Sequence, residues 1–362
     1  MKVGLIIYGS LETRSGGYLY DRMLVATLRE AGHAVALYSL PWQSYPAHLL
    51  HNCRLGWAAK LIADPPDLLL QDELNHPSLF LLNRLLARRL ACPLVSVVHH
   101  LRSDESHPPA VQPLYRAVER AYLNSVDGFL YNSQTTRRAV ERHLRRPRPG
   151  YVAHPAADHI QPPDHRTVLA YLARRARGDR PLQVLFLGNV IPRKGLHLVV
   201  EALGHLPPGG WRLQIAGNTT IDPAYTGQVK MAAARAGIAR QITWHGAVGQ
   251  SRLRDLLAAA DLLAVPSYEG FGIVYLEAMA FGLPVIAGAT GAAQEIVRHG
   301  VNGYLVTPGN ALELAAFARL FVDNRIHLAT LGYQARLHYE RHPTWRAIMS
   351  GALEWLHEFS NA

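Results

Sequence analysis

Short apolar runs alternate with helix-length amphipathic segments along most of the chain. Runs that are apolar on both faces predict five strands in the first part, at 3–8, 34–38, 67–70, 94–98 and 128–132. Helical spacing between them predicts helices near 17–31, 77–90, 110–124 and 133–144. Near-continuous apolar strands are typical of a parallel sheet covered on both faces, so the alternation predicts a doubly wound α/β domain.

The pattern breaks once and then restarts. Residues 145–180 are rich in proline and arginine and show one short helical patch without further periodicity. The restart predicts strands at 182–187, 211–216, 241–245, 262–265 and 284–287, with a short one at 303–306. A last amphipathic stretch at 344–358 predicts a closing helix. We therefore expect two doubly wound domains, 1–165 and 166–342, followed by a C-terminal helix at 343–362.

The composition is that of a globular protein with a basic surface. Of 362 residues, 49% are hydrophobic and 18% are charged, which excludes a disordered chain, a collagen and a coiled coil. The formal net charge of +10 rests on 33 Arg and only four Lys, at positions 2, 60, 194 and 230. Arginine suits phosphate and carboxylate, so charge alone leaves nucleic acid, anionic lipid and phosphorylated ligands open. Codon bias is the alternative source of the arginine excess.

Cysteine content and hydropathy further limit the classes of protein to which this chain can belong. The two cysteines, Cys53 and Cys92, argue against a disulfide framework and against a cysteine metal site. No apolar run reaches the length of about 18 residues that predicts a membrane span. The chain enters a predicted strand directly and not a leader, so we expect a cytoplasmic protein. Basic motifs interleaved with aromatic residues are absent from the sequence, so we expect no nucleic-acid partner.

The strongest motif follows the predicted strand 262–265. Glu269, Gly270 and Gly272 lie in the loop that leads into a helix, and Glu277 lies about two turns into that helix. The glycines let the backbone approach a ligand, and helix-start N–H groups point into the same space. A carboxylate accepts two hydroxyl hydrogen bonds from a vicinal diol, so the two glutamates suit a sugar and a ribose. The alternative is that Glu269 caps the helix and Glu277 is solvated.

A second motif follows the predicted strand 182–187. Gly188 and Asn189 form the turn, and Arg193 and Lys194 precede a helix start, which predicts an anion site. Codon bias toward arginine would have replaced Lys194, so a compact and flexible ammonium is favoured there. A plain surface turn is the alternative.

Two weaker motifs lie in the first domain. Gly16 and Gly17 follow the first strand and open a helix, which resembles a phosphate loop but lacks its full glycine spacing. His99 and His100 end the strand 94–98, where an imidazole faces the ligand side of the sheet. A plain helix start and structural histidines are the alternatives. The sequence shows no carboxylate, histidine or cysteine pattern with metal-ligand spacing, so we expect no metal.

In this order, the four motifs resemble glycosyltransferase family 4, the retaining enzymes of glycosyl transferases group 1 with the GT-B fold. Two glutamates separated by seven residues within a Glu-Gly-Phe-Gly run, as at Glu269 and Glu277, are typical of that family. Further similar segments lie at 242–246, 282–287, 294–297 and 300–306. The resemblance covers nearly the whole chain. It implies two Rossmann-like, doubly wound domains facing each other across a deep cleft, with the acceptor domain first, joined by the C-terminal helix, and the donor domain second.

The resemblance also implies a role for each matched residue. Glu269 would contact the donor sugar on its reacting face, and Glu277 would hold the ribose hydroxyls. Lys194 would neutralise the leaving diphosphate, which Gly16 and Gly17 would approach from the other domain. The backbone N–H groups of Phe271, Gly272 and Ile273 would bind the sugar. His99, or His100 if the register is one residue off, would contact the 6-hydroxyl of that sugar.

One position departs from the family. Where the family usually has arginine after the strand-end glycine, this chain has Asn189, and we expect Arg193 to supply the missing charge beside Lys194.

The implied function is retaining transfer of a hexosyl group from a UDP- or GDP-linked sugar to a hydroxyl acceptor, with no metal or other cofactor. The acceptor class, a glycan, a small molecule or a lipid, stays open. The amphipathic stretch 49–62 and the arginine-rich run 137–148 leave open a peripheral contact with the inner membrane face, against the alternative of an ordinary surface helix and a basic linker. A GT-B nucleotide-sugar epimerase or phosphorylase is the alternative enzyme, although the paired glutamates argue against both. A non-enzymatic binding protein is a third hypothesis.

Overall fold

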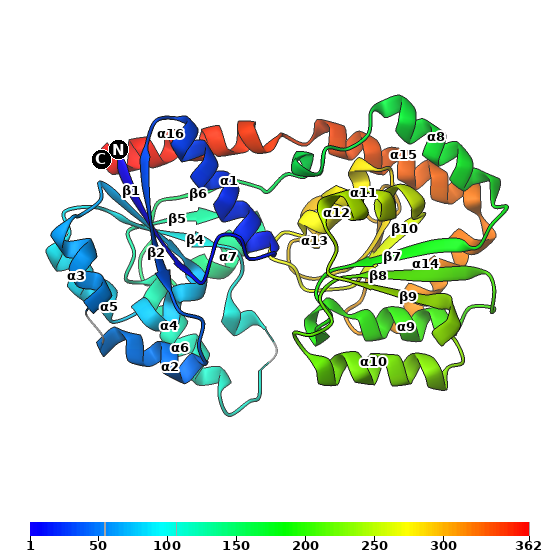
Figure 1. Cartoon of the computed structure of the whole chain (residues 1–362), viewed down its shortest axis with the longest axis horizontal. Coiled ribbons are helices and arrows are strands. Elements are labelled where there is room, and N and C mark those ends of the chain that lie inside the picture. Colours follow the sequence, from blue (N-terminus) through cyan, green and yellow to red (C-terminus); the bar gives the residue numbers. More distant parts are fainter. Residues whose placement is uncertain (54–55, 106, 362) are drawn as a thin grey trace. The chain divides into compact units, whose positions relative to one another are not determined.

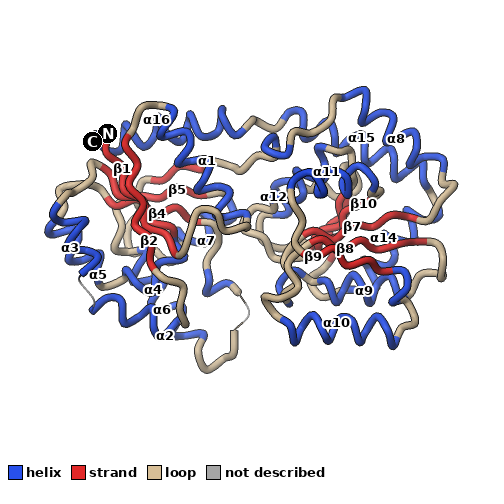
Figure 2. The backbone as a smooth tube through the Cα atoms, viewed as in Figure 1, coloured by secondary structure: helices blue, strands red, loops and turns tan. Residues whose placement is uncertain are grey.

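The chain forms two doubly wound α/β units, each built on one parallel sheet (Figures 1 and 2). A computed structural model describes residues 1–53, 56–105 and 107–361. Unit 1 comprises residues 1–155 and the C-terminal helix from 345, and unit 2 comprises residues 156–344. Every pair of neighbouring strands is parallel, which confirms the fold class expected from the apolar runs.

The sheet of unit 1 has the order β2-β1-β3-β4-β5-β6. Its strands are β1 (Lys2–Tyr8), β2 (Ala34–Leu40), β3 (Leu68–Asp72), β4 (Leu94–Val98), β5 (Gly128–Tyr131) and β6 (Gly150–Val152). The strand order reverses between β1 and β3. At such a switch point, connections leave in opposite directions and open a crevice at the carboxyl ends of the strands.

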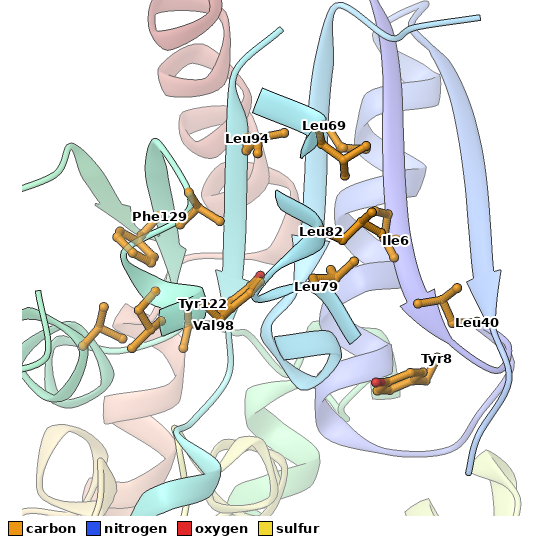
Figure 3. Packing of buried hydrophobic residues seen from close by; sticks show 14 of the residues in the cluster. Ile6, Tyr8, Leu40, Leu69, Leu79, Leu82, Leu94, Val98, Tyr122 and Phe129 are labelled. Carbon is orange, nitrogen blue, oxygen red and sulfur yellow. The ribbon is translucent and has the colours of Figure 1, made fainter. Parts of the chain in front are cut away.

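Helices cover both faces of this sheet. They are α1 (Gly16–Glu30), α2 (Tyr45–Leu50), α3 (Gly56–Ala63), α4 (His76–Leu79), α5 (Leu82–Arg89), α6 (Gln112–Leu123), α7 (Gln134–Glu141) and α16 (Trp345–Asn361), with short 3-10 turns η1 (His51–Cys53), η2 (Glu73–Asn75) and η3 (Arg102–Asp104). α1 packs against α16, and α4 packs against α2 and α6. Figure 3 shows the core beneath α4 and α5, where Leu79 and Leu82 meet Ile6 and Leu69 of the sheet.

Two expectations for unit 1 were wrong in detail. The helix expected at 77–90 is split, because the side chain of Asn52 accepts the backbone N–H groups of Leu81 and Leu82, at 3.0 and 3.2 Å, and caps α5 there. No strand was expected at residues 150–152, which lie in the proline- and arginine-rich break, yet they form the edge strand β6. Gly150 permits this pairing, because a Cβ there would lie 2.6 Å from the ring of Tyr131.

The sheet of unit 2 has the order β12-β11-β10-β7-β8-β9. Its strands are β7 (Leu182–Leu187), β8 (Trp211–Ala216), β9 (Ile242–Gly246), β10 (Leu262–Val265), β11 (Val285–Gly288) and β12 (Gly303–Val306). This is the dinucleotide-binding order 3-2-1-4-5-6, with its switch point between β7 and β10.

The helices of unit 2 lie on both faces of its sheet (Figure 1). They are α8 (His165–Arg177), α9 (Leu196–Gly204), α10 (Pro223–Arg235), α11 (Gln250–Ala259), α12 (Ile273–Ala280), α13 (Ala293–Ile296), α14 (Ala311–Asp323) and α15 (Arg325–Arg341), with 3-10 turns η4 (Asp158–Ile160), η5 (Pro192–Lys194) and η6 (Ala239–Gln241). α9 packs against α10 and α14, and α15 packs against α8 and α12.

The segment between the two sheets is more ordered than its composition suggested. The contacts divide the chain after Pro155, where the sequence analysis expected residue 165. α8 has 13 residues, begins at the cap Asp164, which accepts from Thr167 N at 2.7 Å, and ends at Gly178 with a φ of +67°. Its buried Arg175 donates to the carbonyls of Ala260, Phe281 and Gly282 and thereby ties the helix to unit 2.

None of the helices in the described part of the chain combines the length and apolar character that a bilayer crossing requires. The two membrane-contact candidates fall on separate elements. The stretch 49–62 runs from the end of α2 into α3, with residues 54–55 outside the described residues, and the run 137–148 covers the end of α7 and the turn after it.

Candidate active site

Lys194 and Glu269 meet at the switch point of unit 2. Lys194 ends η5, which follows β7, and Glu269 lies in the loop that follows β10, the strand paired with β7. Their side chains are 14% and 12% exposed and form an ion pair. The two strongest motifs of the sequence, 75 residues apart, are therefore brought together at the edge where such sheets bind ligands.

The Glu269 carboxylate is held by several neighbouring groups. Ser267 Oγ donates to Glu269 Oε1 at 2.6 Å, and the backbone carbonyl of Glu269 accepts from Ala292 N at 2.9 Å. Burial alone would raise the pKa of Glu269, but Lys194 and Arg193 outweigh it and hold that pKa below its ordinary value. Glu269 is thus an oriented anion at neutral pH, in a position to accept hydroxyl hydrogen bonds.

Two glycines allow the backbone to pass close to these charges. Gly188 has a φ of +147°, and its position faces the aliphatic part of Lys194. Gly272, with a φ of +99°, is the N-cap of α12. Within the described residues, the N–H groups of Gly272 and Ile273 contact no acceptor. Such N–H groups at a helix start are donors for a ligand oxygen.

Glu277 has a partner that the sequence analysis missed. It is 7% exposed on α12, and its Oε1 lies 3.0 Å from Nε2 of His159 in η4. Gln250 in turn donates to the backbone carbonyl of His159. The histidine lies in the proline-rich segment without clear periodicity, and no local pattern connects it to a residue 118 positions away.

Arg193 lies beside Lys194 and Glu269. Its Nη1 donates to the carbonyl of Tyr268 at 2.7 Å, and its charge contributes to the low pKa of Glu269. Among the described residues, the side chain of Asn189 makes no hydrogen bond. The compensation of Asn189 by Arg193 remains a prediction.

Unit 1 brings Gly17 and His99 together. Gly16 and Gly17 begin α1 after the cap Ser15, whose side chain accepts from Tyr18 N. A Cβ at Gly17 would lie 3.1 Å from Cδ2 of His99, which follows β4 and is 8% exposed. His100 points elsewhere, with its Nε2 2.9 Å from Oε1 of Glu105. Of the two histidines, His99 therefore lies beside the glycine loop.

Buried carboxylates lie next to the imidazole of His99. Its Nε2 lies 3.3 Å from Oδ1 of Asp21, a fully buried residue of α1, and Asp72 ends β3 nearby. Burial alone would lower the pKa of His99, but Asp21, with Asp72 and Glu73, raises it to about 9. Burial and the charge of Asp21 raise the pKa of Asp72 to about 7. The sequence analysis missed Asp21 and Asp72, because only the fold brings α1, β3 and β4 together at one edge.

Two groups of described residues have three metal-ligating atoms within 4.8 Å of one another: Asp21, Asp72 and His99, and Glu73, His76 and Glu119. In the first group Asp21 and Asp72 raise the pKa of His99 to about 9, so a metal would have to displace the proton of the imidazolium. In the second, burial raises the pKa of both Glu73 and Glu119 to about 8, so a metal would have to displace protons from these carboxyls as well. The expectation of no metal stays a prediction.

Two family matches cover most of the chain. Residues 172–338 match the family described as Glycosyl transferases group 1, and residues 20–160 match Glycosyltransferase Family 4. D-inositol 3-phosphate glycosyltransferase of Mycobacterium leprae is 34% identical over 229 residues, 60% of this chain and 52% of that protein. The chain spans about half the length of the curated relatives it matches.

The solved structures agree in fold. Sucrose-phosphate synthase from Thermosynechococcus elongatus superposes with a TM-score of 0.85 at 21% identity over 100% of both chains. HepE of Anabaena in complex with UDP-glucose has a TM-score of 0.79 at 22% identity, covering 99% of this chain and 100% of the other. The two sheets are thus those of GT-B glycosyltransferases. Since the two families match the two halves of the chain in the expected order, this protein belongs to the family 4, group 1 glycosyltransferases.

Proposed function

We propose that this glycosyltransferase moves a hexosyl group from a nucleoside diphosphate sugar to a hydroxyl acceptor with retention of configuration. The observation that carries the proposal is the ion pair between Lys194 and Glu269 at the switch point of unit 2. A diphosphate binds to cations, and the hydroxyls of a hexose bind to hydrogen-bond acceptors. At this sheet edge Lys194 is the cation, and Glu269, in contact with it, is the acceptor. The structure of HepE with UDP-glucose supports the donor class by fold likeness.

In the proposed mechanism the leaving diphosphate develops negative charge that the protein must stabilise. The ammonium of Lys194 and the guanidinium of Arg193 supply positive charge, and the N–H groups of Gly272 and Ile273 supply further donors. The diphosphate competes with Glu269 for Lys194, which releases the carboxylate toward the sugar hydroxyls. Glu277 holds the ribose. With retention, the acceptor attacks on the face that the diphosphate leaves, and the departing phosphate oxygen accepts the acceptor proton.

Unit 1 contributes two elements to the same proposal. Gly16 and Gly17 at the start of α1 suit phosphate oxygens, and His99, as an imidazolium beside Gly17, donates to a sugar hydroxyl. The acceptor would bind to unit 1. The relatives named for inositol 3-phosphate and sucrose phosphate make small polyols and sugars the first acceptors to assay.

The donor test is a titration of UDP, GDP and ADP, with thermal unfolding as the readout, because a ligand that binds only the native state raises the unfolding midpoint. We expect UDP or GDP to raise it in the wild type, and to raise it far less in Lys194→Ala. Transfer is then assayed with the matching sugar nucleotide, and the anomeric configuration of the product is read by NMR. An inverted product would contradict retention.

The alternative, a nucleotide-sugar epimerase or phosphorylase, predicts different products. Epimerised donor without acceptor, or cleavage that requires phosphate, would contradict the transferase proposal. A non-enzymatic binding protein would bind the nucleotide without transfer activity. The wild type and Glu269→Ala would then give the same result in the transfer assay. Peripheral membrane contact is a separate hypothesis, tested by flotation with anionic vesicles.

A further inference from the structure

A cationic cavity lies in unit 2 apart from Lys194 and Glu269. It has a volume of about 240 Å³ and lies between the segment after α13 and the C-terminal end of α15. Arg298, His338, Arg341 and His342 line it, with Asn302 and Gln334 as neutral donors. No carboxylate is among the lining residues that the structure describes. A cavity with two arginines and no carboxylate in its described lining has an unmatched positive potential.

The two arginines of the cavity are exposed and unpaired. Within the described ranges, neither the Arg298 nor the Arg341 guanidinium makes a hydrogen bond or an ion pair. Arg336, one turn earlier on α15, is by contrast bound to Glu340. Burial lowers the pKa of His338 to about 4, and the charges of His342, Arg298 and Arg341 add to that effect. The burial and the charges around His338 therefore disfavour a further cation in this cavity.

We propose that this cavity is a binding site for a phosphate group, held by Arg298 and Arg341 and supplied as free phosphate or by a small phosphorylated metabolite. Guanidinium groups bind phosphate through paired, charge-assisted hydrogen bonds. Two arginines carry the charge that a phosphate dianion neutralises, whereas a monocarboxylate leaves half of it unmatched. The volume is below the ~300 Å³ at which drug-sized pockets begin, which fits a small anion.

Two residues that line the cavity lie near Phe271 and Met279, at the start and the end of α12. The ring of His342 lies 6.2 Å from that of Phe271, and the amide of Asn302 lies 3.9 Å from Sδ of Met279 on α12. Phe271 precedes α12, the helix that carries Glu277. Two lining residues of the cavity are therefore neighbours of the segments that are proposed to hold the donor, but the phosphate site stands independently of that proposal.

The test measures phosphate binding by thermal unfolding in the whole protein. Inorganic phosphate should raise the unfolding midpoint of the wild type, and Arg298→Gln or Arg341→Gln should weaken that binding about tenfold or more. Arg235→Gln is the matched control, an exposed arginine of α10 without a partner in the described chain, and should respond like the wild type. Phosphate also stabilises proteins non-specifically, and the control measures that part.

Two further measurements distinguish this site from the donor site and identify the source of the phosphate. In Lys194→Ala the response should persist, whereas its loss there would place the phosphate at the donor site and overturn the proposal. If glucose 6-phosphate binds more tightly than inorganic phosphate, with the same dependence on the two arginines, the source is a phosphorylated metabolite. If the two bind equally, the source is free phosphate. An equal, arginine-dependent response to acetate would contradict the phosphate assignment.

A local readout completes the test. Phosphate should raise the pH at which the NMR resonance of His338 titrates, because the bound anion neutralises the arginines that disfavour the imidazolium. The signal is assigned with His338→Gln. A titration pH that does not move while the unfolding midpoint rises would overturn the proposal.

Discussion

The ammonium of Lys194 forms an ion pair with the carboxylate of Glu269 across the two adjacent strands at which the sheet order of unit 2 reverses. Both side chains are nearly buried, so each is the other's main charge compensation. This ion pair contributes to both stability and function. The proposed donor must take the place of Glu269 beside Lys194 when its diphosphate binds.

Removing one member of this pair should cost both stability and activity. Lys194→Met or Glu269→Gln should lower the free energy of unfolding by about 3–5 kcal/mol, because a nearly buried charge is left unpaired. The double variant should recover most of that stability, since no unpaired charge remains. Its kcat should stay about 10²-fold or more below the wild type. Denaturant unfolding and transfer assays on the three variants check this, and a double variant with restored activity would exclude a role in the reaction.

Asp21→Asn should change the pH dependence of transfer. In the wild type, Asp21, Asp72 and Glu73 face His99 and keep it protonated up to about pH 9. Without the Asp21 charge, less opposes the effect of burial and the pKa of His99 falls, so the alkaline limb of kcat/KM should move to lower pH. Asp21→Glu should restore part of the wild-type profile. If only the thermal midpoint changes and the limb does not move, Asp21 is structural.

Gly17→Ala should weaken donor binding with little effect on folding. The new methyl group would lie 3.1 Å from Cδ2 of His99, so the imidazole must shift by a few tenths of an ångström. Alanine favours the helix itself. We expect a raised donor KM and an unfolding free energy within about 1 kcal/mol of the wild type. Gly227→Ala is the control, because a Cβ there meets nothing within 4 Å in α10. Equal KM values for the two variants would contradict the placement of His99 at the donor.

The stability contributed by Glu73 and Glu119 should fall as pH rises from about 4.5 to about 8. Burial raises the pKa of both carboxyls from 4.5 to about 8. In this window the folded state binds more protons than the unfolded state, so the free energy of unfolding declines until the carboxyls also ionise in the folded state, near pH 8. Glu73→Gln removes one ionisation and should flatten the decline in the free energy of unfolding. Glu354→Gln, at an exposed position of α16, should not change the slope.

The strands, most helices and the strongest motifs could be predicted because their signals are local. Apolar runs at 94–98 or 182–187 report a strand buried on both faces, and a glycine pair before an amphipathic helix reports a loop at a strand end. The same logic located Glu269 and Lys194. It failed at residues 77–90, where the side chain of a distant residue, Asn52, interrupts the helix, and at 150–152, where pairing with β5 makes a strand of a linker-like sequence.

By itself, the sequence determined the parallel α/β class, the two-unit plan and the residue types at the strand ends, because hydrophobic periodicity and glycine spacing are properties of neighbouring residues. Only the tertiary structure decided which of those residues meet. Parallel strands must be connected by long crossovers, so residues at one sheet edge come from distant parts of the chain. The fold alone therefore placed Lys194 on Glu269, Asp21 behind His99, His159 on Glu277 and Arg298 beside Arg341.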